Sequence, residues 1–462
     1  MRKFLILLVM ACVQVSFGQP NPDTLWTRTY GGSSDEWAYS VQQTTDGGYV
    51  VAGETYSFGA GSNDFYLVKT NGEGDTLWTR TYGGINDEKA RSVQETGDGG
   101  YIVAGCTGSF GAGGFDFYLV KTNSLGDTLW TRTYGGSRED KAHSVRQTTD
   151  GGYIVAGETY SFGQGTPNCP NFYIVKTNPL GDTLWTRAFE GSTYDDEAYS
   201  VQQTADGGYV VAGYTNSFGA GGWDFYLVKT NYQGFTHWGH TYGGSGSDWA
   251  YSVQQTADGG YIVVGFTGSF GVGTPYSNFY LVKTNSQSDT LWTRTYGGSA
   301  PEWAYSVQQT PDGGYIVAGY TGSFGAGSGD FYLVKTNTSG DTLWTRTYGG
   351  SSDDGAWSVQ PTDDGGYIVA GYTSSFGAGA ADFYLVKTGP ELAPRHLVIA
   401  LQAGNAVLSW PPTAALSYNI YGATLPFVTG VLLDVTSNTV WTDINTSVRP
   451  SPYFYYVTAV AP

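Results

Sequence analysis

The sequence predicts an all-β fold built from seven copies of one four-stranded unit, on two observations. The first is the motif DGGY, which begins at Asp46, Asp98, Asp150, Asp206, Asp258, Asp312 and Asp364. The second is a segment typified by DFYLVKT, which begins at Asp64, Asp116, Asn171, Asp224, Asn278, Asp330 and Asp382 at spacings of 52 to 55 residues. A chain with this period is a repeat protein, so each unit is interpreted as one structural module.

Each unit contains four short runs rich in Val, Ile, Tyr, Thr and Trp, which predict strands. In the first unit these runs are Ala38–Thr44, Tyr49–Thr55, Phe65–Thr70 and Thr76–Tyr82. The glycines of DGG allow the positive φ that a tight hairpin requires between the first two runs. Four such strands cannot bury both faces of their own sheet. Seven sheets packed face to face around an axis can, which predicts a seven-bladed β-propeller.

The unit also resembles the blade of secreted and NHL-like bacterial propellers. That resemblance implies that AYSVQQT is the innermost strand, GGYVVAG the second, DFYLVKT the third and TLWTRTY the outermost. The repeat region opens with an outermost run, Thr24–Tyr30, and closes with a third-strand run, Phe383–Thr388. We therefore expect these two runs to pair, because pairing would leave no blade edge open.

The sequence divides into three parts. Residues 1–18 are typical of a secretory signal peptide, because Arg2 and Lys3 precede an apolar run, Phe4–Val13. An alternative is a lipoprotein signal with Cys12 acylated. Residues 19–388 form the expected propeller, and no transmembrane span is expected.

Residues 389–462 depart from the repeat and read as further strands. The runs VLSWPP, SYNIYGAT and YFYYVTAV resemble a fibronectin type III-like β-sandwich. The resemblance implies a core tryptophan at Trp410 and a late-strand tyrosine at Tyr455 or Tyr456.

Composition excludes some classes of partner and cofactor. The formal net charge of −18 argues against nucleic acid, which would be repelled. After signal cleavage only Cys106 and Cys169 remain, at unmatched positions, and no zinc motif is present. We expect no cofactor, with calcium as the one ion that the acidic loops could attract.

Those loops place carboxylates just before each innermost strand: Asp35-Glu36, Asp87-Glu88, Glu139-Asp140, Asp195-Asp196-Glu197, Asp248, Glu302 and Asp353-Asp354. They would form a ring near the axis. Because the oxygen-rich spacing of a dedicated calcium loop is missing, backbone capping or pairing between blades is the competing interpretation.

The loops of variable length lie on one rim of the predicted propeller. Insertions occur around Thr166–Pro170 and Thr274–Ser277, and the loop at Ser192–Glu197 has one extra residue. Variable loops on a rigid scaffold often bind ligands, although neutral drift explains the same variation.

Aromatic residues occur on this rim at Trp37, Trp223, Trp249 and Trp303. They could provide sugar-binding platforms or pack between blades, and we expect Trp37, Trp249 and Trp303 to be the more accessible tryptophans. A second set recurs in every unit and predicts buried packing: Trp26, Trp78, Trp130, Trp185, Trp238, Trp292 and Trp344.

One sector breaks the symmetry of the innermost strands. Units two and three carry Lys89 and Arg91, then Lys141 and His143, where units one, five and six have tryptophan and tyrosine. The next unit presents Asp195, Asp196 and Glu197. Such mixed charge predicts either a specific site for a polar or zwitterionic ligand or a salt-bridged seam between blades.

The function expected from the sequence is that of an exported, monomeric, non-catalytic binding or scaffold protein of the cell surface or extracellular space. Its partner would be a polysaccharide or a surface protein. The alternative is a glycan-active protein, lectin-like or an endoglucanase-type hydrolase, as some relatives with such repeats suggest. A glycosidase needs two carboxylates at a set separation, and the near-equivalent acidic loops single out no such pair, so no catalytic residue is assigned.

Overall fold

The computed structural model describes residues 22–163, 169–189, 195–272 and 277–391, together with the backbone of the strands between 398 and 460. The expected signal peptide, with Cys12, lies outside the described residues, as do most of the inserted loop residues. Thr24–Thr388 form one compact unit. No described residues form a helix with the length and hydrophobicity needed to cross a bilayer.

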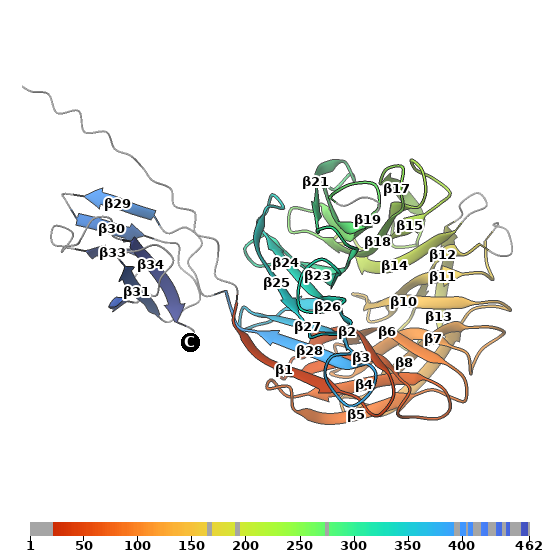
Figure 1. Cartoon of the computed structure of the whole chain (residues 1–462). Coiled ribbons are helices and arrows are strands. Elements are labelled where there is room, and N and C mark those ends of the chain that lie inside the picture. The colour runs from red at the N-terminus through yellow and green to blue at the C-terminus, as the bar shows by residue number, and fades with distance from the viewer. Residues whose placement is uncertain are drawn as a thin grey trace, which may run out of the picture. The chain divides into compact units, whose positions relative to one another are not determined.

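The compact unit is a propeller of seven four-stranded antiparallel sheets, as the repeat predicts. Blade 1 consists of β2 (Glu36–Gln43), β3 (Tyr49–Thr55), β4 (Asp64–Thr70) and β5 (Thr76–Tyr82), from the axis outward (Figure 1). Blade 2 consists of β6 (Glu88–Glu95), β7 (Tyr101–Thr107), β8 (Asp116–Thr122) and β9 (Thr128–Tyr134). Blade 3 consists of β10 (Asp140–Gln147), β11 (Tyr153–Thr159), β12 (Asn171–Thr177) and β13 (Thr183–Phe189).

The remaining blades repeat this order. Blade 4 consists of β14 (Asp196–Gln203), β15 (Tyr209–Thr215), β16 (Asp224–Thr230) and β17 (Thr236–Tyr242). Blade 5 consists of β18 (Asp248–Gln255), β19 (Tyr261–Thr267), β20 (Asn278–Thr284) and β21 (Thr290–Tyr296). Blade 6 consists of β22 (Glu302–Gln309), β23 (Tyr315–Thr321), β24 (Asp330–Thr336) and β25 (Thr342–Tyr348). Each inner strand begins at the acidic residue, earlier than the sequence alone indicated.

Blade 7 closes the ring by joining the two ends of the repeat region. It consists of β26 (Asp354–Pro361), β27 (Tyr367–Thr373), β28 (Asp382–Thr388) and, as its outer strand, β1 (Thr24–Tyr30). Strand β1 runs antiparallel to β28, with Arg28 opposite Leu385 and Tyr30 opposite Phe383, and Figure 1 shows the red and blue strands together. The predicted closure is confirmed.

The hydrophobic core lies between the blades. All residues of β3 and β4 are buried, because the neighbouring blades cover both faces of the sheet. At each interface a fully buried phenylalanine meets a tyrosine of the next blade, as Phe65 meets Tyr118 at 5.2 Å between ring centres. The recurrent outer tryptophans pack edge-on against the next blade, as Trp78 does against Tyr101. Most of them are half-buried, less than we expected, and only Trp344 is fully buried among them.

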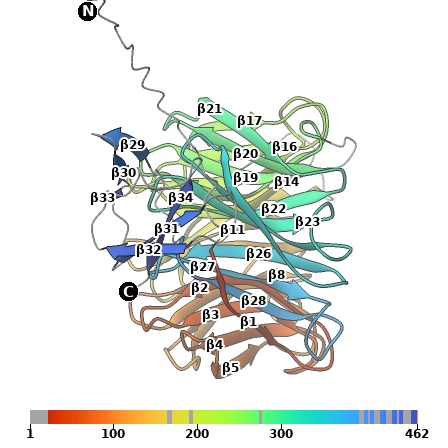
Figure 2. The same ribbon diagram turned by 60° about the vertical axis from the view of Figure 1, so that its left-hand side comes forward.

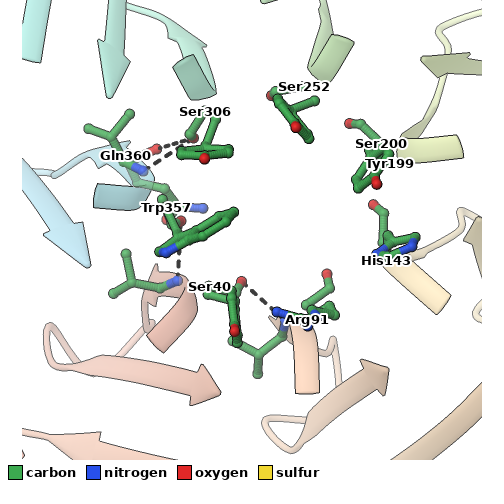
Figure 3. A pocket seen from close by; sticks show the side chains of 18 of the residues that line it. Ser40, Arg91, His143, Tyr199, Ser200, Ser252, Ser306, Trp357 and Gln360 are labelled. Atoms are coloured by element: carbon green, nitrogen blue, oxygen red, sulfur yellow. Dashed lines mark hydrogen bonds between the residues drawn. The ribbon is translucent and has the colours of Figure 1, made fainter. Parts of the chain in front are cut away.

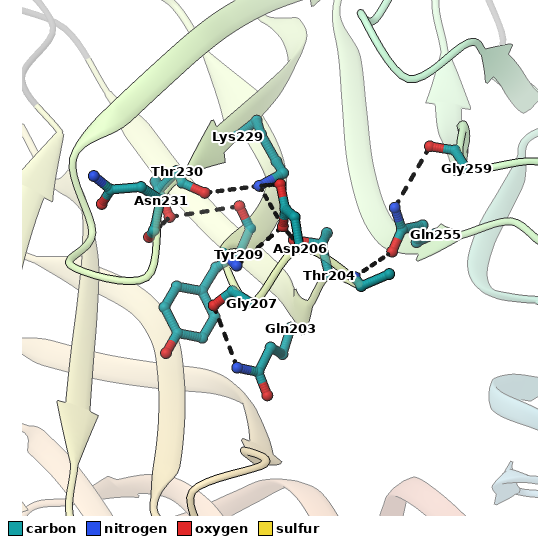
Figure 4. A network of polar contacts seen from close by, with 12 residues as sticks. Gln203, Thr204, Asp206, Gly207, Tyr209, Lys229, Thr230, Asn231, Gln255 and Gly259 are labelled. Atoms are coloured by element: carbon teal, nitrogen blue, oxygen red, sulfur yellow. Dashed lines mark hydrogen bonds and ion pairs between the residues drawn. The ribbon is translucent and has the colours of Figure 1, made fainter.

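In each blade the lysine of the third strand forms an ion pair with the aspartate of the DGG hairpin. This contact explains why both motifs recur. In blade 4 the buried Lys229 lies 2.9 Å from Asp206 and donates to the Thr230 carbonyl at 2.8 Å (Figure 4). Gly207 has φ 82°, a conformation that favours glycine. Burial alone would raise the pKa of Asp206, but hydrogen bonds from Thr204, Lys229 and Gly208 outweigh it and lower the pKa to about 2.

The strands after residue 391 form two three-stranded antiparallel sheets. One contains β29 (Val398–Gln402), β30 (Asn405–Ser409) and β33 (Val440–Asp443). The other contains β32 (Val431–Thr436), β31 (Ser417–Ala423) and β34 (Phe454–Val460), which lie together in Figure 2. The side chains of Trp410, Tyr455 and Tyr456 lie outside the described part of the structure, so the fibronectin type III resemblance stays a prediction.

Candidate functional site

Every inner strand contains a β-bulge at the same position, and this bulge shapes the channel along the propeller axis. In β2, Ala38 pairs with Gly53 and Ser40 pairs with Ala52, which leaves Tyr39 as the extra residue. A bulge turns its extra side chain out of the ladder alternation. The bulge residues all line the channel: Tyr39, Arg91, His143, Tyr199, Tyr251, Tyr305 and Trp357.

The residue after each bulge residue is a serine, and these serines form a ring that joins neighbouring blades around the channel. Each serine hydroxyl accepts a hydrogen bond from a valine N–H of the next blade, such as Val93 to Ser40 at 3.2 Å. The ring closes between blades 7 and 1, where Val41 donates to Ser358 at 3.2 Å. Ladder pairing between these inner strands is absent in the described propeller, so the serines satisfy backbone donors that would otherwise lack a partner.

A ring of glutamines forms the next layer. Gln42 accepts from the Glu95 N–H at 2.6 Å, and Gln202 accepts from the Gln255 N–H at 2.7 Å. Blade 3 has Arg146 at this position, and a guanidinium has no acceptor atom. Arg146 therefore cannot accept from blade 4, whereas five of the six glutamines accept from a backbone N–H of the next blade.

The channel between these layers has a volume of about 450 Å³. Its wall consists of hydroxyl, amide and aromatic groups from all seven blades, with the charged residues confined to blades 2 and 3. In Figure 3, Arg91, His143 and Tyr199 follow one another around the wall. The volume lies within the range of small-molecule sites.

Arg91 and His143 occupy the channel end of the asymmetric sector. The Arg91 guanidinium lies 3.8 Å from the centre of the Tyr39 ring, and Tyr39 donates to buried Glu54 at 2.7 Å. His143 stacks on Tyr199 at 4.5 Å, and its buried Nε2 has no hydrogen-bond partner among the described residues. Burial, together with the charges of Arg91 and Lys141, lowers the pKa of His143 to about 3, so the imidazole is neutral at pH 7.

A cluster of charged groups from blades 3 and 4 lies next to His143. Lys141 pairs with Glu139 at 2.7 Å and with buried Glu158 at 3.2 Å, and Tyr199 donates to Glu197 at 2.8 Å. Burial raises the pKa of Glu158 well above its usual value, and the adjacent Glu197 carboxylate raises it further. Burial beside the Glu197 carboxylate therefore favours the protonated form of Glu158.

His143, Glu158 and Glu197 could in principle hold a metal ion, since their ligand atoms lie within 4.8 Å of one another. The Lys141 ammonium, however, already contacts the Glu158 carboxylate that such an ion would need. The arrangement fits a salt-bridged cluster better than a metal site, but both ion pairs of Lys141 lie within blade 3 and do not form the predicted salt bridge between blades.

The carboxylates of the loop ring accept hydrogen bonds from the protein itself, many of them from backbone N–H groups. Glu36 is fully buried and accepts from the Gly32 N–H at 2.7 Å, the Thr55 hydroxyl at 2.7 Å and the Ser57 N–H at 3.1 Å. Asp196 is equally buried and accepts from the Ser217 hydroxyl at 2.9 Å. The same position is buried in every blade: Glu36, Glu88, Asp140, Asp196, Asp248, Glu302 and Asp354. These contacts match the capping interpretation.

The rim tryptophans do not line the channel. Trp37 stacks on Tyr372 at 5.2 Å, Trp249 stacks on Tyr214 at 4.3 Å, and Trp303 stacks on Tyr320 at 5.2 Å. Trp223 packs edge-on against Trp249 at 5.7 Å. Trp37 is 36% exposed, whereas the other three are half-buried, so the expected contrast with the outer tryptophans holds only for Trp37.

The remaining sequence candidates lie away from the channel wall. Lys89 is half-buried opposite Cys106 in the β6–β7 ladder, and no ion pair involves it in the described structure. The Asp195 carbonyl accepts from the Asn216 N–H at 2.9 Å. The predicted sector thus splits into a channel part, Arg91 and His143, and a charged cluster, Lys141 and Glu197.

Sequence reasoning missed Arg146 and Glu158. A signal for Arg146 was present, because unit three reads VRQ where most units read VQQ. Glu158 belongs to a second-strand position that varies among Glu, Cys, Tyr and Phe, and nothing local marks it as a neighbour of Glu197.

Comparison with known proteins agrees with the fold. A family model described as "Domain of unknown function (DUF5122) beta-propeller" matches residues 44–76 and 310–342. Both matches cover the second and third strands, in blades 1 and 6. No curated protein matches the chain.

Several solved structures are similar at low identity. The Neurospora crassa Pan2 WD40 domain matches at 10% identity over 78% of this chain and 97% of that chain, with a TM-score of 0.46. BBS1N in complex with ARL6DN matches at 10% identity over 79% of this chain and 96% of that chain, with a TM-score of 0.45. A putative gluconolactonase matches at 10% identity over 82% of this chain and 97% of that chain, with a TM-score of 0.37.

Proposed function

We propose that this is an exported, non-catalytic binding protein whose ligand site is the central channel of the propeller. The observation that carries the proposal is the polar channel of about 450 Å³, to which all seven blades contribute side chains. Sites of this size enclose small molecules, and a few convergent polar groups fix their orientation. Export rests on the signal-like residues 1–18, with acylation at Cys12 as the alternative route to the cell surface.

The wall chemistry favours a polyhydroxylated ligand such as a sugar. Serine hydroxyls and glutamine amides both donate and accept hydrogen bonds, which suits hydroxyl-rich molecules. Trp357 and Tyr305, stacked at 3.9 Å, offer the aromatic faces on which sugar rings pack. A terminal sugar of a polysaccharide or of a glycosylated surface protein would satisfy both features.

A glycoside hydrolase is the second candidate, because buried Glu158 has a raised pKa, as a general acid requires. The carboxyl groups of glycosidases stand roughly 5 Å or more apart, with the substrate between them. Glu158 and Glu197 come from adjacent blades, and their ligand atoms lie within 4.8 Å of each other. This spacing leaves no room for a glycosidic bond, so we favour binding over hydrolysis.

The proposal is tested by titrating the full chain with mono- and oligosaccharides while assaying reducing-end release. We expect binding without release, and a loss of affinity of about tenfold or more in Trp357→Ala. Trp37→Ala is the matched control, since Trp37 also stacks on a tyrosine but lies on the rim. Loss of binding in the control alone would place the site on the rim. Release that Glu158→Gln abolishes would establish the hydrolase.

A further inference from the structure

The basic residues of the propeller that do not belong to the repeat all lie in one sector. The outer-strand arginines and third-strand lysines recur in nearly every unit, and each lysine pairs with a hairpin aspartate. The others are Lys89, Arg91, Arg138, Lys141 and Arg146, all in blades 2 and 3. In a chain with a formal charge of −18, two of these five residues, Arg91 and Arg146, line the channel, and both lie on one side of its wall.

Arg146 is the residue whose position the scaffold explains least. Its Nη1 donates to the Val145 carbonyl at 2.9 Å and to the Ser92 hydroxyl at 3.4 Å, and it forms no ion pair with a carboxylate in the described structure. It also replaces a glutamine that would accept the Gln203 N–H of blade 4. A guanidinium directed into a polar channel without a counter-ion is the arrangement that anion sites use.

Arg91 places a second guanidinium on the adjacent blade. It occupies the bulge position of β6, which other blades fill mostly with tyrosine, and lies over the Tyr39 ring. Ser92, the next residue, accepts hydrogen bonds from both Val145 and Arg146. Arg91 and Arg146 therefore line adjacent parts of the channel wall, in blades 2 and 3, and the neutral His143 lies on the same strand as Arg146.

We propose that the ligand of the channel carries an anionic group and that Arg146 and Arg91 bind this group. The inference rests on the proposed function, since it specifies the ligand of that same channel. The hydroxyl, amide and aromatic remainder of the wall points to a sugar acid, whose carboxylate meets the arginines while the ring contacts the serines, glutamines and Trp357. A sugar phosphate shares the anionic chemistry and is distinguished by the experiment.

The experiment compares matched pyranoses that differ only at one carbon. Glucose, galactose and mannose are each titrated calorimetrically as the neutral sugar, the uronate and the 6-phosphate. We expect at least one uronate to bind about tenfold or more tightly than its neutral counterpart, and Arg146→Gln to remove that preference. Phosphates that bind more tightly than uronates would overturn the sugar-acid assignment.

Arg146→Gln is an informative variant because it restores the glutamine that the other repeats have at this position. The new amide can accept the Gln203 N–H, so we expect a melting temperature equal to or above that of the wild type. Arg132→Gln is the control, since it removes one positive charge from the exposed outer strand of the adjacent blade 2. Arg91→Tyr, which also restores the commonest residue at its position, should weaken the uronate in the same direction.

The outcomes separate the two proposals. If neutral and acidic sugars bind equally well and Arg146→Gln changes neither, the channel binds sugars and the anion inference is wrong. If no sugar of the panel binds, both proposals fall together. A melting temperature that drops by several degrees in Arg146→Gln, with affinity unchanged, would assign Arg146 a structural role.

Discussion

Blades 5 and 6 and blades 2 and 3 share one scaffold but present different surfaces to the channel. Both pairs have the same four strands, the same bulge and the same lysine-fastened hairpin. At the bulge, blades 5 and 6 present Tyr251 and Tyr305, whereas blades 2 and 3 present Arg91 and His143. The bulge position contributes little to the inter-blade core, so it can vary without loss of the fold. Function in such a repeat is expected where a position is structurally free and one sector departs from the rest.

The largest effect should be the same in both regions, because the core does not differ. Phe279 at the interface of blades 5 and 6 and Phe117 at the interface of blades 2 and 3 are both fully buried. Truncation of either to Ala should lower the free energy of unfolding by about 3–5 kcal/mol. Chemical denaturation of the two variants checks this, and a clear difference would mean that the asymmetric blades are also less well packed.

The Lys141–Glu158 ion pair of blade 3 should be the more sensitive part of the asymmetric sector. Lys141→Ala leaves buried Glu158 without its cation, and because Lys141 itself is 29% exposed we expect a loss of about 2 kcal/mol. Lys89→Ala is the control, with an expected change within about 0.5 kcal/mol. Equal losses of stability in the two variants, measured by thermal unfolding, would mean that the ion pair between Lys141 and Glu158 does not stabilise the protein. Adding Glu158→Gln to Lys141→Ala should recover part of the stability.

The pH dependence of stability should have opposite signs in the two regions. The lowered pKa of Asp206, about 2, contributes stability that is present above pH ~4 and is lost as the pH falls through 2. Because Asp206 is 58% exposed, we expect only about 0.5 kcal/mol from its ion pair. The raised pKa of Glu158 acts oppositely, since its contribution is present below pH ~4 and is lost as the pH rises through the folded-state value.

Melting curves between pH 2 and 8 would therefore diverge. The deficit of Asp206→Asn relative to the wild type should shrink as the pH falls below 4. Glu158→Gln should gain on the wild type as the pH rises. A Glu158→Gln curve parallel to that of the wild type would contradict the raised pKa of Glu158.

The last comparison concerns the serine ring. Ser200 accepts from the Val253 N–H at 3.2 Å in the regular part of the ring, and Ser92 accepts from both Val145 and Arg146. Ser200→Ala should cost about 1 kcal/mol, because one buried donor loses its acceptor. Ser92→Ala should cost at least as much by thermal unfolding. It should also weaken the uronate, since Arg146 loses a positioning contact, whereas Ser200→Ala should not change the preference for uronate.

The sequence by itself determined the number of blades, the strand positions and the closure by β1, because these follow from local alternation, turn residues and the phase of the repeat. It also located the departures at Arg91 and His143. Only the tertiary structure decided what those departures face. The bulge decides which residue of each inner strand points into the channel. Blade packing brings Arg91, His143 and Arg146 together across as many as 55 residues of sequence and places Glu158 beside Glu197. Contacts between blades depend on the stacking of whole sheets, which no local pattern encodes.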